Sequence, residues 1–134
     1  VNTVGVMGAG LALQFKLVFP HNFSEYKRAC DTGYLRTGTV LLVKEERSEL
    51  GRSVYIANFP TKRHWRQPSQ LEWIEEGLIH LHEILTAFHI GKVAIPKLGA
   101  GLGGLDWEDV LPLIVKEFES DKTITAYVYT GGPK

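Results

Sequence analysis

Residues 93–107 read Val-Ala-Ile-Pro-Lys-Leu-Gly-Ala-Gly-Leu-Gly-Gly-Leu-Asp-Trp, and this stretch decides the fold class. Its first three residues are an apolar run between a glycine and a proline, which predicts a short strand buried on both faces. A glycine-rich loop follows at residues 99–104, and apolar residues at helical spacing begin at Trp107. A strand, a glycine loop and a helix in this order are typical of an α/β protein.

The same alternation of strand and helix runs through the rest of the chain. Helices are predicted over residues 11–19 (ended by Pro20), from the N-cap Asn22 to residue 31, and from a capping box of Ser69 and Glu72 to residue 88. A last helix is predicted over residues 107–118, where Asp109 instead of Asp106 as the N-cap would ease the conflict with Pro112. Strands are predicted over residues 1–6, 39–43, 53–59, 93–95 and 123–129, with a charged turn at residues 44–52. The chain is therefore expected to form an α/β sandwich with a mixed or mostly parallel sheet.

Composition limits the class of protein further. The 134 residues suit one domain, and 15 Lys and Arg balance 15 Asp and Glu, so any anion site must be local. The single cysteine, Cys30, rules out an internal disulfide and a multi-cysteine zinc site, and it fits a reducing cytosol. No apolar run has the roughly 18 residues that a membrane span needs. We expect a monomer in the cytoplasm with no membrane association.

Two glycine-rich loops precede helices, one at residues 5–10 and one at residues 99–104. Glycine lets backbone N–H groups approach a phosphate, and a helix N-terminus adds positive partial charge. Ligands of α/β sheets bind beyond the carboxyl ends of the strands, where both loops are expected. The loops predict a diphosphate site, although each could also be a simple tight turn. Neither matches a P-loop.

A basic segment, Asn-Phe-Pro-Thr-Lys-Arg-His-Trp-Arg, covers residues 58–66 at the end of a predicted strand. Cations with an interleaved aromatic side chain suit nucleic acid, and a lysine among other cations could act as a nucleophile. A solvated basic loop is the alternative. The other histidines (His21, His80, His82 and His89) have no metal-ligand spacing, so we expect no metal site.

Three segments resemble the macrodomain family, and within it the branch of DarG antitoxins: residues 4–16 (VGVMGAGLALQFK), residues 58–66 and residues 95–107. The resemblance covers essentially the whole chain. It implies a three-layer α/β/α sandwich with a mixed central sheet, with residues 1–134 forming one macrodomain. Macrodomains have an earlier strand as well, which we expect to lie outside this chain.

The resemblance also implies roles for individual residues. Lys62 matches the catalytic lysine of the family, and His64, Trp65 and Arg66 would meet the DNA that leaves the site. The ADP-ribose-binding residues would be Asn2, Gly8, Ala9 and Gly10 at the distal ribose, Thr61 beside the lysine, Gly99, Ala100, Gly101, Leu102, Gly103 and Gly104 around the diphosphate, and Tyr129 at the adenine. No cofactor is implied.

The function implied by the DarG branch is removal of ADP-ribose from thymidine in single-stranded DNA, which reverses the action of a DarT-like toxin. The related protein glycohydrolases have an aspartate at the position of Gly103, so the lysine–aspartate pair of that branch is absent here. Two alternatives remain. The domain could hydrolyse protein-linked ADP-ribose or ADP-ribose 1″-phosphate, or it could bind ADP-ribose without catalysis.

Overall fold

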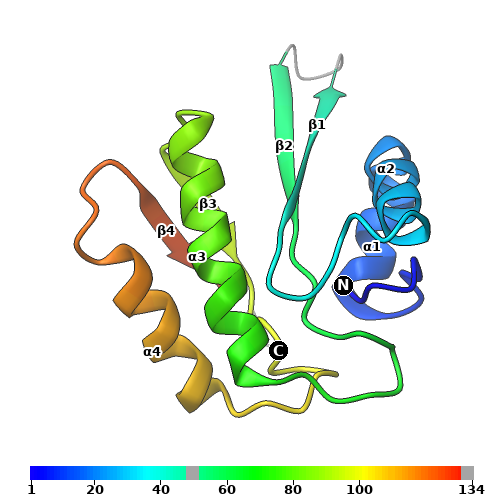
Figure 1. Cartoon of the computed structure of the whole chain (residues 1–134). Helices are drawn as coiled ribbons and strands as arrows, with labels where there is room; N and C mark the ends of the chain where they lie inside the picture. The colour runs from blue at the N-terminus through cyan, green and yellow to red at the C-terminus, as the bar shows by residue number, and fades with distance from the viewer. Residues whose placement is uncertain (48–51, 131–134) are drawn as a thin grey trace.

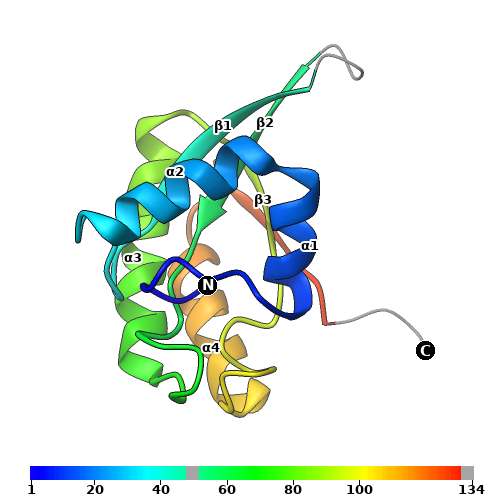
Figure 2. The ribbon, with the colours of Figure 1, turned by 90° about the vertical axis from the view of Figure 1, so that its right-hand side faces the viewer.

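A computed structural model describes residues 1–47 and 52–130 of the chain. Its elements follow the order α1 (Gly10–Val18), α2 (Pro20–Asp31), β1 (Leu41–Arg47), β2 (Arg52–Asn58), α3 (Leu71–Ala87), β3 (Lys92–Ile95), α4 (Trp107–Phe118) and β4 (Thr125–Val128). The strands lie between α1 and α2 on one side and α3 and α4 on the other (Figures 1 and 2). The α/β class and the layered arrangement expected from the sequence are therefore confirmed.

The strands form two pairs of opposite type. β1 and β2 are antiparallel, with Leu41 opposite Asn58 and Arg47 opposite Arg52. β3 and β4 are parallel, from Lys92 opposite Thr125 to Ile95 opposite Val128. A single parallel bridge joins Asn2 to Lys62, so the start of the chain runs beside the segment that follows β2. Both strand directions occur, but the described residues form two short ladders instead of one continuous sheet.

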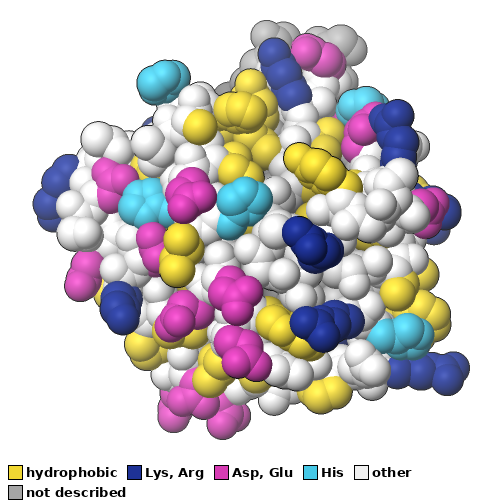
Figure 3. Space-filling model, in the orientation of Figure 1, with side chains coloured by type: hydrophobic (Ala, Val, Ile, Leu, Met, Phe, Trp, Pro, Cys, Tyr) yellow, Lys and Arg dark blue, Asp and Glu magenta, His cyan; other side chains and the backbone are white. Residues whose placement is uncertain are grey.

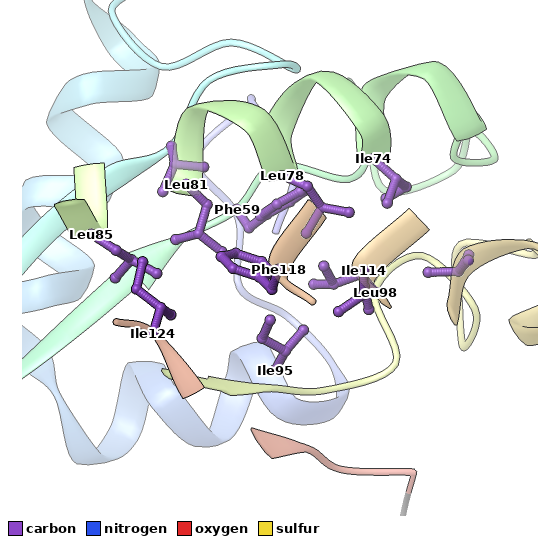
Figure 4. Close-up of a cluster of buried hydrophobic side chains, with 12 residues drawn as sticks. Phe59, Ile74, Leu78, Leu81, Leu85, Ile95, Leu98, Ile114, Phe118 and Ile124 are labelled. Atoms are coloured by element: carbon purple, nitrogen blue, oxygen red, sulfur yellow. The ribbon is translucent and has the colours of Figure 1, made fainter. Parts of the chain in front are cut away.

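The main core lies between α3, α4 and the strands (Figure 4). Side chains from α3 repeat at three- and four-residue steps, which places Ile74, Leu78, Leu81 and Leu85 on one buried stripe. The stripe packs against buried residues of α4, the strands and the loops beside them: Val40, Phe59, Ile95, Leu98, Val110, Ile114, Phe118 and Ile124. The long amphipathic helix predicted from this spacing is confirmed.

Gly77 of α3 is where the ring of Phe59 crosses the helix. A Cβ atom on Gly77 would lie 2.4 Å from Cζ of Phe59, whose side chain is itself buried. We expect Gly77→Ala to lower the free energy of unfolding by up to about 2 kcal/mol, since overpacking costs about 1–3 kcal/mol and alanine returns about 1 kcal/mol of helix propensity. Urea denaturation measures this, with Thr86→Ala on the exposed side of α3 as a control. A variant at least as stable as the wild type would contradict the close packing.

Three predicted helix boundaries are wrong. Pro20 begins α2 instead of only ending α1, and Asn22 lies inside that helix. α4 begins after the N-cap Asp106, not Asp109, so Pro112 lies within the helix, where it is exposed. The N-cap of α3 is Gln70, with no side-chain hydrogen bond, so the capping box does not form. The amide of Ser69 instead donates to the carbonyl of Gly103, 2.9 Å away.

Three predictions about strands also need correction. Residues 1–6 form no strand, since only Asn2 in this segment makes a bridge, to Lys62. The charged residues 44–47 continue β1 instead of forming a turn, and residues 48–51 of the predicted turn lie outside the described residues. Glu45 is buried because its carboxylate accepts a hydrogen bond from the amide of Asn22 in the first turn of α2. Of β3, Ile95 is buried, while Ala94 is exposed, so this strand is not covered on both faces.

His82 ties α3 to the C-terminal end of α4. Its Nδ1 lies 2.7 Å from Glu117 and its Nε2 lies 2.6 Å from Asp121, and the ring packs against Phe118 with centroids 5.0 Å apart. The hydrogen bonds to Asp121 and Glu117 raise the pKa of His82 above its usual 6.5. Hydrogen bonds from Thr123 and His82 lower the pKa of Asp121 to about 2.

This cluster makes stability depend on pH. Because the folded-state pKa of His82 is raised, its contribution is fully present below about pH 6.5 and is lost as the pH rises through the raised value. We expect the difference in melting temperature between the wild type and His82→Gln to shrink as the pH is raised from about 6 towards about 9. Thermal melts across this range test it. A difference that stays constant would show that the charged form of His82 contributes nothing.

Candidate functional site

A cleft of about 1060 Å³ opens where the chain leaves β2, β3 and β4. Its lining comprises Val1, Asn2, Val6, Gly8, Ala9, Gly10, Leu11, Ala12, Phe15, Phe59, Thr61, Lys62, Trp65, Ala94, Pro96, Lys97, Leu98, Gly99, Gly101, Leu102, Gly103 and Tyr129. Both glycine loops and the basic segment therefore meet at one site. The sequence predicted both loops and the basic segment at this end of the strands, which is where ligands of α/β sheets bind.

The side chain of Asn2 holds the first glycine loop through hydrogen bonds to its backbone. The Oδ1 atom of Asn2 accepts hydrogen bonds from the amides of Val4 and Val6, at 3.1 and 3.3 Å, and its Nδ2 donates to the carbonyl of Val6 at 2.8 Å. The hydroxyl of Tyr26 lies 2.8 Å from Oδ1 and 2.9 Å from the carbonyl oxygen of Asn2. Asn2 therefore fixes the shape of the loop as well as lining the cleft.

Tyr26 was not singled out from the sequence. It is fully buried in a second apolar cluster with Met7, Ala29 and Leu35. Burial raises the pKa of its hydroxyl well above the usual value, so the group stays protonated and can donate to Asn2. An aromatic residue in an amphipathic helix predicts burial, but its contact with Asn2 joins segments 24 residues apart and leaves no local signal.

α1 begins directly at the first loop. Gly10 has φ +59, a conformation that side chains rarely adopt, and it turns the chain into the helix. The first backbone N–H groups of a helix have no partner within it, so the start of α1 presents donors and positive partial charge at the cleft. Gly8, Ala9 and Gly10 all line the cleft, as expected for a loop that contacts a ligand.

The second loop is a tight turn whose amides divide into two groups. The amides of Ala100, Gly104 and Leu105 hydrogen-bond to carbonyls of residues 97, 101 and 99. Within the described chain, the amides of Gly101, Leu102 and Gly103 donate to no protein atom, and all three residues line the cleft. Consecutive unpaired amides form an anion-binding concavity.

Gly103 lies at the most crowded point of this loop. A Cβ atom there would be 2.4 Å from the carbonyl oxygen of Gly99 and 2.4 Å from Oγ of Ser69. Ser69 is 5% exposed, and its Oγ has no hydrogen-bond partner in the structure. An aspartate therefore cannot occupy position 103 without opening the loop, which explains in physical terms why a lysine–aspartate pair is absent.

Lys62 reaches the cleft from the segment after β2. The amide of Thr61 donates to the carbonyl of Val1 at 2.8 Å, and Lys62 itself forms a β-bridge with Asn2. These contacts with the first two residues of the chain hold the backbone of Lys62 in place. Its Nζ donates to the carbonyl of Trp65 at 3.2 Å, and the side chain is half-buried. This hydrogen bond ties the amine to the backbone of Trp65, which also lines the cleft.

The cleft is positively charged. Lys62 and Lys97 are the charged side chains among its lining residues, and no carboxylate belongs to the described lining. Lys97 was not assigned a role from the sequence, although it lies inside one of the quoted motifs; its Nζ is 5.9 Å from the centroid of the Trp107 ring. Two lysines, the unpaired amides and a helix N-terminus together suit a diphosphate.

Much of the remaining lining is apolar. Phe15 and Phe59 come from α1 and the end of β2, and Leu98 and Leu102 come from the second loop. Tyr129 follows β4 at the rim and is 61% exposed, so it is free to stack on a ligand. These residues can cover a flat aromatic group such as a purine, and sequence analysis had named only Leu102 and Tyr129 among them.

Four of the predicted site residues do not line the cleft. Ala100 and Gly104 form the back of the second loop through their own hydrogen bonds. The ring of His64 stacks on Trp65 with centroids 3.9 Å apart, and its Nδ1 accepts from the amide of Arg66 at 3.1 Å. Trp65 itself lines the cleft, while His64 and Arg66 lie outside the lining; we refer to these three residues as the shelf.

Among the residues described, no group of three or more His, Cys, Asp and Glu side chains is arranged to hold a metal ion. The same residues contain no helix long and apolar enough to cross a membrane. What the cleft offers is an amine, backbone amides and apolar surface.

Comparisons with known proteins agree with this geometry. A model of the Macro domain family matches residues 1–114. The DNA ADP-ribosyl glycohydrolase of Mycobacterium tuberculosis is 44% identical over 136 residues, which cover 100% of this chain and 38% of that protein. The chain thus spans 38% of the length of this curated relative.

Two solved structures are similar throughout the chain. The macrodomain of Mycobacterium tuberculosis DarG has a TM-score of 0.92 and 43% identity, covering 98% of this chain and 86% of that one. Thermosipho africanus DarTG in complex with ADP-ribose has a TM-score of 0.88 and 38% identity, covering 96% of this chain and 36% of that one. Because the family model matches residues 1–114 of the 134, this chain belongs to the macrodomain family.

Proposed function

We propose that this domain is a DNA ADP-ribosyl glycohydrolase, which removes ADP-ribose from thymidine in single-stranded DNA. The observation that carries the proposal is the cleft itself, in which one lysine from the β2 end faces two amide-lined glycine loops and no carboxylate belongs to the described lining. The names of the similar proteins support the same activity. The diphosphate would lie on the amides of residues 101–103 and at the start of α1, between Lys62 and Lys97.

The chemistry needs little beyond Lys62. In the overall hydrolysis the bond between the anomeric carbon and the base breaks, and water supplies a hydroxyl to that carbon and a proton to the base. Lys62 can assist by moving a proton to or from the reacting groups. Alternatively, when the ribose ring opens, the anomeric carbon still carries the base as an iminium-type centre. The neutral amine of Lys62 attacks this carbon, the base leaves with a proton, and a Schiff base forms on Lys62. Water then hydrolyses the Schiff base and frees both ADP-ribose and the amine.

The remaining residues would position the substrate. Asn2 and the turn at residues 8–10 would hold the distal ribose, with Thr61 beside it. Tyr129 would stack on the adenine, and the shelf of His64, Trp65 and Arg66 would support the base and strand that leave the cleft.

The test offers purified protein an ADP-ribosylated thymidine oligonucleotide, an ADP-ribosylated glutamyl protein and ADP-ribose 1″-phosphate in parallel. Release of ADP-ribose from the oligonucleotide alone supports the proposal. Release only from the protein, or only of phosphate, would assign the domain to one of the alternative hydrolases. Tight binding of ADP-ribose with no turnover of any substrate would make it a binding module.

We further propose that the domain acts as a monomer in the cytoplasm and that its partner is a DarT-like toxin. The solved DarTG structure supports a partnership of this kind, and the lone half-buried Cys30 is consistent with a reducing compartment. Light scattering after size exclusion tests the monomer, and co-purification with a transferase encoded beside the chain tests the partner.

A further inference from the structure

A second hollow lies on the other side of the Asn2–Lys62 bridge. Its volume is about 640 Å³. The polar residues of its lining are Thr3, Arg36, Thr37, Thr39, Arg63 and Glu76, and the others are Cys30, Gly33, Leu35 and Gly38. Thr3 and Arg63 directly follow Asn2 and Lys62 in the chain, so this groove begins one residue beyond the proposed catalytic lysine. We refer to it as the arginine groove.

Arg63 is fixed in the arginine groove by three contacts. Its carbonyl accepts a hydrogen bond from Thr3 Oγ1 at 3.1 Å, and its Nε lies 3.4 Å from Thr37 Oγ1. Its guanidinium carbon is 4.8 Å from the centroid of the Trp73 ring. An arginine stacked on an aromatic ring keeps its terminal N–H groups in a defined plane. Those N–H groups therefore stay available to an incoming anion.

Arg36 is held through its backbone instead of its side chain. Its amide donates to Thr39 Oγ1 at 3.1 Å, and that hydroxyl donates to the carbonyl of Arg36 at 2.7 Å. The side chain itself is exposed. Within the described chain, neither Arg36 nor Arg63 has a carboxylate within ion-pair distance.

Charge is separated on this face of the molecule. Figure 3 shows Asp and Glu side chains gathered over α3 and α4, and Lys and Arg side chains over the loops beside them. Glu76 of α3 is the acidic residue at the boundary, because it lines the arginine groove beside Gly38. Two arginines and one glutamate leave the groove with a formal charge of +1, which matches a monoanion such as a phosphodiester.

We propose that the arginine groove binds a phosphodiester of the strand that carries the modified nucleotide. The inference rests on the proposed function, since it requires a polynucleotide to leave the cleft past Lys62. Guanidinium groups match phosphate oxygens with paired hydrogen bonds, and the Thr37 hydroxyl adds a donor at the same place. The groove would then set the path of the strand and make DNA a better substrate than an isolated nucleoside.

The experiment compares two substrates, ADP-ribosylated thymidine nucleoside and an ADP-ribosylated oligonucleotide. Arg36→Gln should lower kcat/KM for the oligonucleotide by about tenfold, the loss expected for one charge-assisted contact, and leave the nucleoside unchanged. The slope of log kcat/KM against log salt should fall by about one unit. Lys116→Gln, which removes the same charge from exposed α4, should change neither substrate.

Glu76→Gln gives a test of opposite sign. Removing this charge should raise kcat/KM for the oligonucleotide about threefold or more and leave the nucleoside unchanged, because a like charge beside a phosphate disfavours binding. The proposal fails if Arg36→Gln changes kcat/KM for both substrates equally or for neither. It also fails if Glu76→Gln lowers kcat/KM for the oligonucleotide.

If the proposed function itself is wrong, the result is different: the wild type releases ADP-ribose from neither substrate. In that case the arginine groove is tested by fluorescence anisotropy with unmodified oligothymidine. Weaker binding by Arg36→Gln than by Lys116→Gln then still supports a phosphodiester site. Equal binding by the two variants overturns it.

Discussion

Lys62→Ala should lose about 10³-fold in turnover of the ADP-ribosylated oligonucleotide while still binding ADP-ribose. The expected loss follows from the size of a single general acid–base contribution, about 10²–10⁴-fold, with no carboxylate in the described lining to replace the amine. Affinity should fall only about fivefold, because a half-exposed cation contributes about 1 kcal/mol and the amides of residues 101–103 remain. Single-turnover kinetics and calorimetry with ADP-ribose measure the two effects separately.

Two lysine variants serve as controls. Lys97→Ala removes the other cation of the cleft and should raise KM more than it lowers kcat, since its Nζ lies near the Trp107 ring. Lys122→Ala removes an exposed lysine outside the cleft and should have no effect on either constant. If Lys62→Ala and Lys97→Ala reduced kcat equally, the special role of Lys62 would be lost.

The role of Lys62 as a nucleophile can be separated from its role as an acid or base. Borohydride present during turnover reduces a Schiff base to a stable secondary amine, which appears as a mass increase on the peptide that contains Lys62. We expect this adduct to be absent from Lys62→Arg. Full turnover by the wild type with no adduct would leave the acid–base route.

The cleft could be predicted from the sequence because its main determinants are local. Glycine spacing before an apolar helical stripe places backbone amides at the end of a strand, whatever the rest of the chain does. The position of Lys62 follows in the same way, since it comes four residues after β2 ends at Asn58. Both loops and the lysine therefore line one site.

The contacts that stabilise the cleft could not be predicted, because they join distant parts of the chain. Ser69 and Glu72 have the spacing of a capping box, but the Ser69 amide instead bonds to Gly103, 34 residues later. Glu45 has the charge of a turn residue and is buried because the start of α2 supplies it with a donor. In each case a tertiary hydrogen bond replaces the local one that the pattern indicates.

Gly103→Ala tests whether the shape of the second loop, and not only its sequence, binds the diphosphate. The new Cβ would lie 2.4 Å from the Gly99 carbonyl oxygen, a backbone atom that cannot rotate away, and 2.4 Å from Ser69 Oγ. The loop must therefore open, which should cost about 1–3 kcal/mol of stability and move the unpaired amides of residues 101–103. Losing two charge-assisted hydrogen bonds predicts at least about 100-fold weaker binding of ADP-ribose.

Gly101→Ala is the matched control for the stability effect. A Cβ at Gly101 meets no atom within 4 Å and its φ is not positive, so this variant should unfold in urea at the same concentration as the wild type. If Gly103→Ala kept both wild-type stability and wild-type affinity, the loop would be loose enough to accept a side chain. An aspartate at position 103 would then be tolerated. Steric crowding could then no longer explain why this chain lacks the lysine–aspartate pair of the protein glycohydrolases. Gly103→Asp decides this directly, because the structure predicts that it loses ADP-ribose binding without gaining release from ADP-ribosylated protein.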